Sequence, residues 1–330
     1  MKAVLIGFGY WGPNIARNLN NSKEFELYGI CDISTEMLSK ARSIYGDKIK
    51  YYTNYKEVIE DSAIDACAVA LRNDIGQQVA REVLKAKKHL FMEKPMATQM
   101  QDALLLKQLA DENDVIIHVD HILVFNPIVR RIKEILDSGE LGDLIFFESN
   151  RANLGPHFKR DMSVMWDLAV HDLAILDYLC DGKEARKIEC MGEKRFCDQE
   201  VVTYLNIKYD GFIAMIKSNW FSPLKERTIV VCGTKKMIVF DDLKDSEKLM
   251  IYDKGVEFDA NSFNDYGEYE AHVRMGDLFV PYVEREDSLL NSVNHFAACI
   301  KKGIQSITGP DQAIRVLRIL NDADKDLKGV

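Results

Sequence analysis

The 330-residue sequence lacks the usual marks of secreted, membrane-spanning and metal-binding proteins. Its seven cysteines are scattered and none forms a C-x-x-C pair, so buried, reduced thiols are expected. No apolar run approaches the ~20 residues that span a bilayer. The N-terminus runs directly into a strand-like segment, without the charged leader and cleavage site of a signal peptide. These absences predict a cytoplasmic protein that does not enter a membrane.

Blocks of like charge are also missing. The formal net charge is -9, but Lys and Arg are interspersed throughout the chain. This balance argues against nucleic acid as the main partner, and a local basic pocket for a phosphorylated ligand stays compatible with it. The chain is too long for one typical core and contains no internal repeat, low-complexity segment or flexible linker. We therefore expect two domains packed together, with the active site between them.

The first 121 residues alternate short apolar runs with amphipathic stretches. The expected strands are 3–6, 25–31, 66–71, 89–92 and 115–119, and the expected helices are 14–21, 34–45, 77–86 and 98–113. Continuous apolar strands that alternate with helices are typical of a parallel sheet covered on both faces. This part of the chain is predicted to form an α/β domain.

From residue 122 the pattern changes to longer mixed or alternating runs separated by turns such as Tyr209-Asp210-Gly211. Such runs favour an antiparallel sheet. The expected strands are 144–150, 201–209, 212–220, 228–232 and 237–240, and the expected helices are 125–139, 164–180, 288–302 and 311–328. The division is therefore a first domain at 1–121 and a second at 122–330.

A glycine-rich turn follows the first expected strand. It reads Gly7-Phe8-Gly9-Tyr10-Trp11-Gly12, and Pro13 then occupies a favoured first-turn position of the next helix. In G-x-G-x-x-G the first two glycines allow a tight turn and close approach to a pyrophosphate, and the third allows helix and strand to pack. Asp32 ends the second strand, where a carboxylate can accept from the ribose 2′-hydroxyl. The turn predicts dinucleotide binding, with NAD favoured over NADP because no Arg or Lys directly follows Asp32.

A set of further motifs carries a family resemblance. They are Glu93-Lys94-Pro95, Asp120-His121, Phe125-Asn126-Pro127, Gly139-Glu140-Leu141-Gly142, Met165-Trp166-Asp167-Leu168-Ala169-Val170-His171-Asp172, Cys232-Gly233-Thr234-Lys235-Lys236-Met237, Asn294-His295-Phe296 and Thr308-Gly309. Together with the glycine turn they span essentially the whole chain. The sequence resembles the Gfo/Idh/MocA oxidoreductase family.

The resemblance implies an NAD-binding Rossmann domain followed by a substrate-binding α/β domain. The second domain would carry a large open, mostly antiparallel sheet whose exposed face builds a homodimer or homotetramer. By similarity, Lys94 is catalytic, His171 is the proton carrier, and the Lys94-Pro95 peptide is cis.

The resemblance also assigns the other site residues. The expected cofactor-binding residues are Gly7, Phe8, Gly9, Tyr10, Trp11, Gly12, Asp32, Ile33, Leu71, Arg72, Glu93, Lys94 and Asn126. The expected substrate-binding residues are Lys94, Asn153, His157, Trp166, Asp167 and His171. One departure is visible, because many relatives have Thr-Pro and then a histidine where this chain has Leu71-Arg72 and Gly76. Arg72 is therefore a candidate for a cofactor or substrate phosphate.

Asp167 and His171 are four residues apart on an expected helix and so share a face. A carboxylate there can hold one imidazole nitrogen and leave the other for proton transfer. The alternatives are a surface pair without a role, and a metal site with His157, although that spacing matches no familiar ligand set. We expect no metal and assign Asp167 to the catalytic group.

Three functions fit the sequence. The subgroup likeness, carried by 150–156, 166–172 and 279–283, is to dehydrogenases of bacterial polysaccharide and nucleotide-sugar pathways, such as those acting on UDP-N-acetylglucosaminuronate. Arg151, Lys159, Arg160, Lys225 and Arg227 are candidates for its diphosphate. The alternatives are a dehydrogenase of a free polyol, inositol or small carbonyl compound, and a dinucleotide-binding regulator without turnover. Intact Lys94, Asp167 and His171 favour an enzyme.

Overall fold

The computed structural model describes residues 1–155, 162–195, 198–263 and 269–329, and the chain divides into two compact units. The first unit comprises Met1–Asn126 and Glu286–Arg318, and the second comprises Pro127–Arg285 and Ile319–Val330. The expected division at residue 121 assigns 286–318 to the second domain. In the structure this segment belongs to the first unit.

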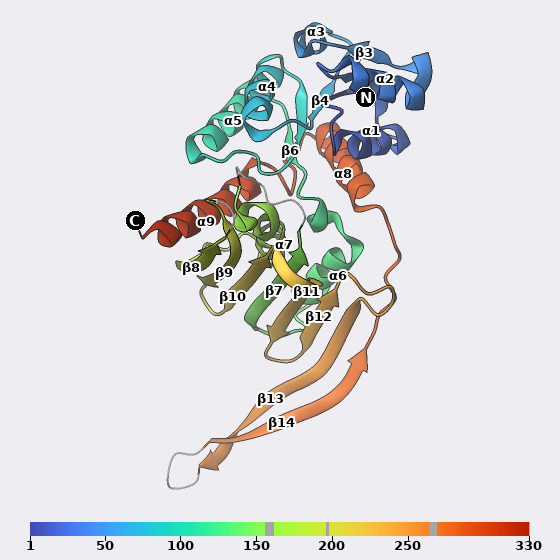
Figure 1. Ribbon diagram of the computed structural model, residues 1–330. Coiled ribbons are helices and arrows are strands. Elements are labelled where there is room, and N and C mark those ends of the chain that lie inside the picture. Colours follow the sequence, from blue (N-terminus) through green and yellow to red (C-terminus); the bar gives the residue numbers. More distant parts are fainter. Residues whose placement is uncertain (156–161, 196–197, 264–268, 330) are drawn as a thin grey trace. The chain divides into compact units, whose positions relative to one another are not determined.

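A six-stranded parallel sheet, in the order β3-β2-β1-β4-β5-β6, forms the centre of the first unit (Figure 1). The strands are β1 (Lys2–Ile6), β2 (Glu26–Cys31), β3 (Lys50–Tyr52), β4 (Ala66–Val69), β5 (His89–Met92) and β6 (Ile117–Val119). The helices are α1 (Gly12–Asn21), α2 (Thr35–Tyr45), α3 (Tyr55–Glu60), α4 (Asn73–Lys85), α5 (Met100–Asn113) and α8 (Ser288–Lys302), with short 3₁₀ turns η1 (Gly46–Lys48) and η2 (Ile122–Phe125). The predicted parallel sheet is confirmed, and β3 and α3 are additions.

A shared hydrophobic core explains why residues 286–318 belong to this unit. Leu5 of β1 lies in one hydrophobic core with Ile15 of α1, Leu38 of α2, and Val293 and Phe296 of α8. The α8 side chains are fully buried there, and Phe296 packs against Phe25 with ring centroids 5.7 Å apart. Burial of apolar surface, at about 25 cal/mol per Å², therefore attaches this late segment to the N-terminal sheet.

The second unit contains an eight-stranded sheet in the order β14-β13-β12-β11-β7-β10-β9-β8. Only β7 and β10 pair in parallel, and all other neighbours are antiparallel. The strands are β7 (Leu144–Leu154), β8 (Lys187–Lys194), β9 (Glu200–Lys208), β10 (Ile213–Asn219), β11 (Phe221–Gly233), β12 (Met237–Asp241), β13 (Leu249–Phe263) and β14 (Tyr269–Phe279). The expected large, mostly antiparallel sheet is confirmed.

One face of this sheet carries the buried side chains. In β9 and β10 every second residue is buried and the residues between them are partly or fully exposed, as in a sheet covered on one side. The helices of this unit are α6 (Pro127–Asp137), the π turn η3 (Met165–Ala169), α7 (Val170–Leu179) and the end of α9 (Pro310–Lys328). The six cysteines in the described part of the chain are buried and form no disulfide.

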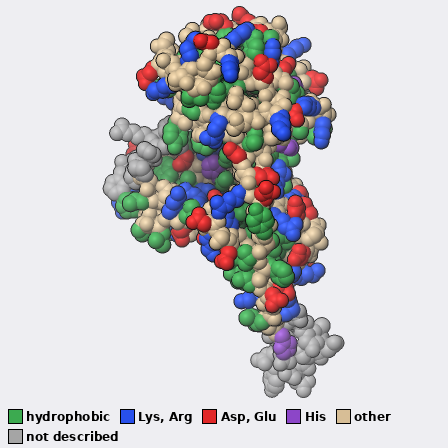
Figure 2. Space-filling model, turned by 90° about the vertical axis from the view of Figure 1, so that its right-hand side faces the viewer, with side chains coloured by type: hydrophobic (Ala, Val, Ile, Leu, Met, Phe, Trp, Pro, Cys, Tyr) green, Lys and Arg blue, Asp and Glu red, His purple; other side chains and the backbone are tan. Residues whose placement is uncertain are grey.

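The long hairpin β13–β14 was not expected from the sequence. Leu249 and Ile251 at the start of β13 are buried, but the described apolar side chains farther along the hairpin are exposed, and Figure 2 shows hydrophobic side chains along its surface. Val256 is 49% exposed, and Val273 and Met275 are each 70% exposed. These side chains form an exposed apolar surface on the second unit.

Candidate active site

The glycine turn between β1 and α1 has the geometry that its pattern predicts. A Cβ atom on Gly7 would lie 2.5 Å from the Ala70 carbonyl oxygen, and Gly7 has φ +100°. A Cβ on Gly12 would lie 2.2 Å from the Gly7 oxygen, whereas a Cβ on Gly9 would meet nothing within 4 Å. Gly7 and Gly12 are therefore required by the turn itself. Gly9 presents bare backbone to open space, which suits a closely approaching phosphate.

Asp32 is fixed at the carboxyl end of β2 by two backbone donors. Its Oδ2 accepts from the Phe8 N–H at 2.7 Å, and its Oδ1 accepts from the Ser34 N–H at 2.8 Å. Ser34 caps α2 by accepting from Met37, so Asp32 is not needed as the cap. An ionised carboxylate has about four acceptor positions, and two of them are used here. The remaining positions fit the ribose hydroxyls of a dinucleotide.

The other expected residues around this turn differ in exposure. Tyr10 and Ile33 are 97% and 91% exposed, so their surfaces are available to a ligand. The Phe8 side chain is buried in the core, and its N–H is already given to Asp32. Trp11 is half-buried and its indole N–H donates to Asp120.

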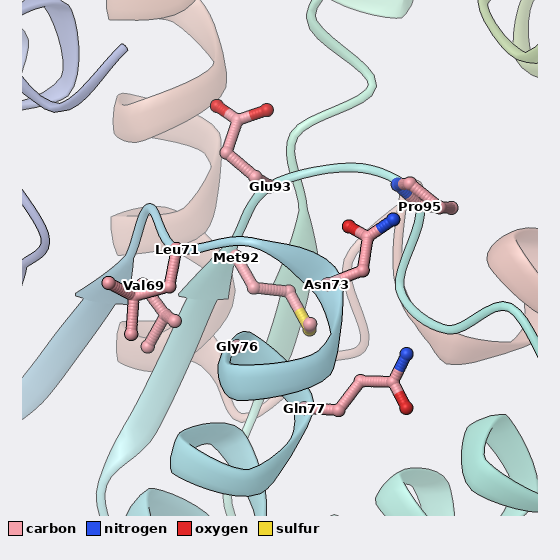
Figure 3. A pocket seen from close by; sticks show the side chains of 8 residues that line it. All are labelled: Val69, Leu71, Asn73, Gly76, Gln77, Met92, Glu93 and Pro95. Atoms are coloured by element: carbon pink, nitrogen blue, oxygen red, sulfur yellow. The ribbon is translucent and has the colours of Figure 1, made fainter. Parts of the chain in front are cut away.

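A small cavity lies where β4 and β5 end and α4 begins (Figure 3). Its volume is about 10 Å³, enough for roughly one water molecule. Figure 3 shows Asn73 and Gln77 of α4 beside it, while the Glu93 carboxyl group points away from these two amides. Helix α4 begins at Asn73, four residues earlier than expected, and Arg72 occupies its N-cap position without a side-chain capping hydrogen bond. Asn73 and Gln77 were not predicted from the sequence.

Leu71 and Arg72 directly precede α4 in the sequence. Leu71 lines the cavity and is half-buried. Arg72 is exposed, and its guanidinium lies 3.5 Å from the Asp74 carboxylate. An exposed pair of this kind is weak and can exchange partners. Arg72 therefore remains a candidate for a phosphate group.

Glu93, Lys94 and Pro95 follow β5, and the Lys94-Pro95 peptide is cis, as expected. Burial and the Asp120 charge raise the pKa of Glu93 to about 8, and Lys94 acts in the opposite direction. Burial and the Lys94 charge lower the pKa of His121 to about 3. Lys94 is half-buried, and its positive charge affects the pKa values of both Glu93 and His121. The expected cofactor-binding residue Asn126, also half-buried, directly follows η2 at the end of this unit.

In the second unit a π turn, η3, precedes α7 and contains Trp166 and Asp167. The Trp220 indole N–H donates to Asp167 Oδ2 at 3.3 Å, and the Trp166 indole donates to Asp324 at 2.9 Å. His171 lies in the first turn of α7 and is partly exposed. π turns are rare and occur frequently at functional sites. The expected helix is present, and its first part is a π turn that contains the predicted site residues Trp166 and Asp167.

Two of the arginines considered for a diphosphate already have partners. Arg151 Nε and Nη2 donate to the two oxygens of Asp172 at 2.8 and 2.6 Å, and both side chains are buried. Arg227 donates to the Asn153 amide oxygen at 3.2 Å and to the Ala152 carbonyl. Arg151 is thus a structural group, and Arg227 fixes the expected substrate-binding residue Asn153.

His157, Lys159 and Arg160 lie outside the described residues. Within the described ranges, no group of three or more His, Cys, Asp or Glu side chains is placed to hold a metal ion. In the same ranges, no helix has the length and apolar composition needed to cross a bilayer.

A glycine turn and a fixed carboxylate at the carboxyl ends of a parallel sheet define a Rossmann-type dinucleotide-binding protein. Residues 1–121 match the model of an oxidoreductase family with an NAD-binding Rossmann fold, GFO_IDH_MocA, and residues 129–239 match the GFO/IDH/MocA C-terminal domain. The chain belongs to the Gfo/Idh/MocA family, and its cofactor is NAD.

Relatives within the family are distant. An inositol 2-dehydrogenase of Salmonella paratyphi B is 24% identical over 183 residues, 54% of each chain, so this chain spans about half the length of that relative. UDP-N-acetylglucosamine 3-dehydrogenase GnnA from Acidithiobacillus ferrooxidans has a similar structure, with TM-score 0.82, 18% identity, and coverage of 100% and 98%. GenD2 from gentamicin A biosynthesis, solved in complex with NAD, has TM-score 0.82, 18% identity, and coverage of 99% and 94%. At these identities the two structures support the fold alone.

Proposed function

We propose that the protein is an NAD-dependent dehydrogenase that oxidises a secondary alcohol of a sugar. The observation that carries this proposal is the position of Lys94, which follows β5 at the carboxyl edge of the parallel sheet that also bears the glycine turn. Ligands of open parallel sheets collect at that edge. A cationic donor there is suited to an oxygen on which negative charge grows as hydride leaves.

The roles of the side chains follow from this reaction. Bound NAD supplies the hydride acceptor. Lys94 donates to the alcohol oxygen, and His171 accepts the hydroxyl proton as general base. Asp167, held by Trp220, orients the imidazole and favours its charged form. Asn153 and Trp166 complete the substrate side of the proposed site.

We propose a nucleotide-linked sugar of polysaccharide biosynthesis as the substrate. The sequence motifs support it, and GnnA, which shares the fold, is a dehydrogenase of UDP-N-acetylglucosamine, a nucleotide-linked sugar. The specific observation that favours a free polyol instead is the Arg151–Asp172 pair, which removes one cation from the expected diphosphate site. The inositol 2-dehydrogenase relative points the same way.

The test is NADH production with UDP-linked sugars, free hexoses and inositol, together with calorimetric titration of UDP in the presence of NAD. Turnover of a UDP-linked sugar and binding of UDP alone are expected. Turnover of inositol without UDP binding would identify a free-polyol dehydrogenase. NAD binding without turnover of any of them would identify a dinucleotide-binding regulator.

We also propose that the protein forms a homodimer or homotetramer through the second unit. Its open sheet and the β13–β14 hairpin expose large apolar side chains, including Met191, Tyr204, Val273 and Met275. Exposed apolar patches of this kind mark interaction surfaces. Light scattering should give at least twice the chain mass of 37.7 kDa, and Val273→Glu with Met275→Glu should lower it. A monomeric wild type would exclude the assembly.

A further inference from the structure

Asp120, directly after β6, is a buried carboxyl group that connects three other segments of the first unit. Its side chain is 2% exposed. It accepts from Ser292 Oγ of α8 at 2.9 Å and from the Trp11 indole of the glycine turn. Its backbone N–H donates to the Met92 carbonyl at the end of β5, at 2.8 Å. Asp120 thus joins the turn before α1 to the strand end that precedes Glu93.

A chain of hydrogen bonds leads to Asp120 from the interior. His118 is fully buried, with Nε2 2.8 Å from Ser292 Oγ and Nδ1 2.9 Å from Ser306 Oγ. Burial, together with His295 and His121, holds the pKa of His118 well below its usual range, so the imidazole is neutral. Because Ser292 gives its proton to Asp120, it must accept from His118 Nε2–H. His118 Nδ1 then accepts from Ser306, and every donor in the chain is directed toward Asp120.

Glu93 is the neighbouring carboxyl group, and its pKa is raised first by burial and then by the Asp120 charge. Two nearby buried carboxylates do not ionise together at neutral pH. Asp120 accepts two side-chain hydrogen bonds, whereas the Glu93 carboxyl group accepts one from the Lys94 backbone N–H and its buried Oε1 accepts none among the described residues. Hydrogen bonds to the charged form stabilise it, so the proton belongs on Glu93 and the negative charge on Asp120.

We propose that Asp120 is a positioning residue that keeps Glu93 protonated beside Lys94, and thereby sets the pH range in which Lys94 acts. The charged groups that face the pair are Lys94, next to Glu93, and Asp287 at the N-cap of α8. The proton exchanges with solvent through Glu93, which is partly exposed. Loss of that proton at alkaline pH places a carboxylate next to the Lys94 ammonium and lowers its capacity to donate to the substrate oxygen.

The first test needs no turnover and so does not depend on the proposed dehydrogenase function. Infrared difference spectroscopy between pH 6 and pH 9 should show the carbonyl stretch of a protonated carboxyl group at neutral pH. The component of this band that titrates near pH 8 should be absent from Glu93→Gln and unchanged in Asp210→Asn, an exposed carboxylate control. In Asp120→Asn the band should disappear at a pH lower by about one unit or more, because the neighbouring negative charge is gone. A wild type without the component near pH 8, or a component near pH 8 that Glu93→Gln leaves in place, overturns the proposal.

The second test rests on the proposed function. The alkaline limb of the turnover profile should move to lower pH by about one unit or more in Asp120→Asn. A purely structural role would lower turnover equally at all pH values, and that result overturns the assignment. Absence of turnover in the wild type with an intact infrared band would reject the dehydrogenase function while leaving the protonated Glu93 established.

Discussion

Arg151 and Asp172 form a buried two-point ion pair between β7 and α7, with N···O distances of 2.8 and 2.6 Å. Asp172 has no exposed side-chain surface, and it directly follows His171. The pair therefore attaches the first turn of α7 to the sheet and limits the positions open to the His171 imidazole.

Removing one partner of this pair should destabilise the second unit strongly. In Asp172→Asn the Arg151 guanidinium stays buried without a counter-charge, which costs about 3–5 kcal/mol. Urea unfolding measures the change. Asp210→Asn is the matched control, because the Arg186–Asp210 pair is exposed and such pairs contribute little. Equal stability of the two variants would contradict this account of the buried pair.

The sequence predicted the strands and helices whose burial produces a recognisable pattern of apolar residues. Buried strands such as β1 and β4 are continuous apolar runs, and β9 and β10 alternate because one sheet face is covered. The hairpin β13–β14 was missed because, beyond the buried Leu249 and Ile251 at the start of β13, described apolar residues such as Val256, Val273 and Met275 are exposed, so no pattern of burial marks one face. The strand β3 (Lys50–Tyr52) was missed because only its last residue, Tyr52, is fully buried, whereas all three residues of β6 are buried.

The residues of the candidate site also fall into two groups, those that the sequence predicted and those that it did not. The glycine turn and Asp32 were predictable because backbone geometry dictates their residue types and spacing. The pair Arg151–Asp172 and the chain from His118 to Asp120 join residues 21 and more than 170 positions apart, and no local pattern marks such contacts. The one available signal was Asp120 itself, an ionisable residue at the carboxyl end of an apolar strand.

Stability should fall as pH rises from 6.5 to 8.5. Glu93 has a folded pKa of about 8, above its unfolded value near 4.3, so the folded state binds more protons in this window. Asp120, with a folded pKa of about 7, acts in the same direction. The depressed pKa values of His118 and His121 cost stability only below about pH 6.5, which is why the window starts there. Thermal denaturation without NAD should show a smaller fall in Glu93→Gln, and an equal fall would remove Glu93 as its cause.

Substitutions at two glycines of the glycine turn should distinguish an effect on folding from an effect on cofactor binding. Gly12→Ala places a Cβ 2.2 Å from the Gly7 oxygen, so the turn must shift and thermal stability should drop. Gly9→Ala meets no atom within 4 Å and should leave stability unchanged, while weakening NAD binding where the pyrophosphate approaches. Calorimetry and thermal denaturation of both variants measure the two effects. Normal NAD affinity in Gly9→Ala would place the pyrophosphate elsewhere.

Cofactor choice should depend on Asp32. Its carboxylate is fixed by Phe8 and Ser34, so it cannot turn away from an additional phosphate. A 2′-phosphate beside it would bring two anions together, which is unfavourable in a confined site. NAD is therefore expected to give a higher kcat/KM than NADP, and Asp32→Ala should narrow the ratio. Equal efficiency of the two cofactors in the wild type would refute the assignment.

The last prediction concerns the reaction itself. If Lys94 donates to the alcohol oxygen and His171 takes its proton, Lys94→Ala and His171→Ala should each lower turnover by about 100-fold or more. NAD should still bind to both variants, since the glycine turn and Asp32 are intact. Asp167→Asn should cost less than His171→Ala, because it removes only the charge of the orienting group and can keep the bond from Trp220. Steady-state assays with parallel NAD titrations measure these effects, and near-normal turnover in Lys94→Ala would overturn the assignment. Full activity in His171→Ala would instead move the base to another residue, and Tyr10, 97% exposed in the glycine turn, would be the next to test.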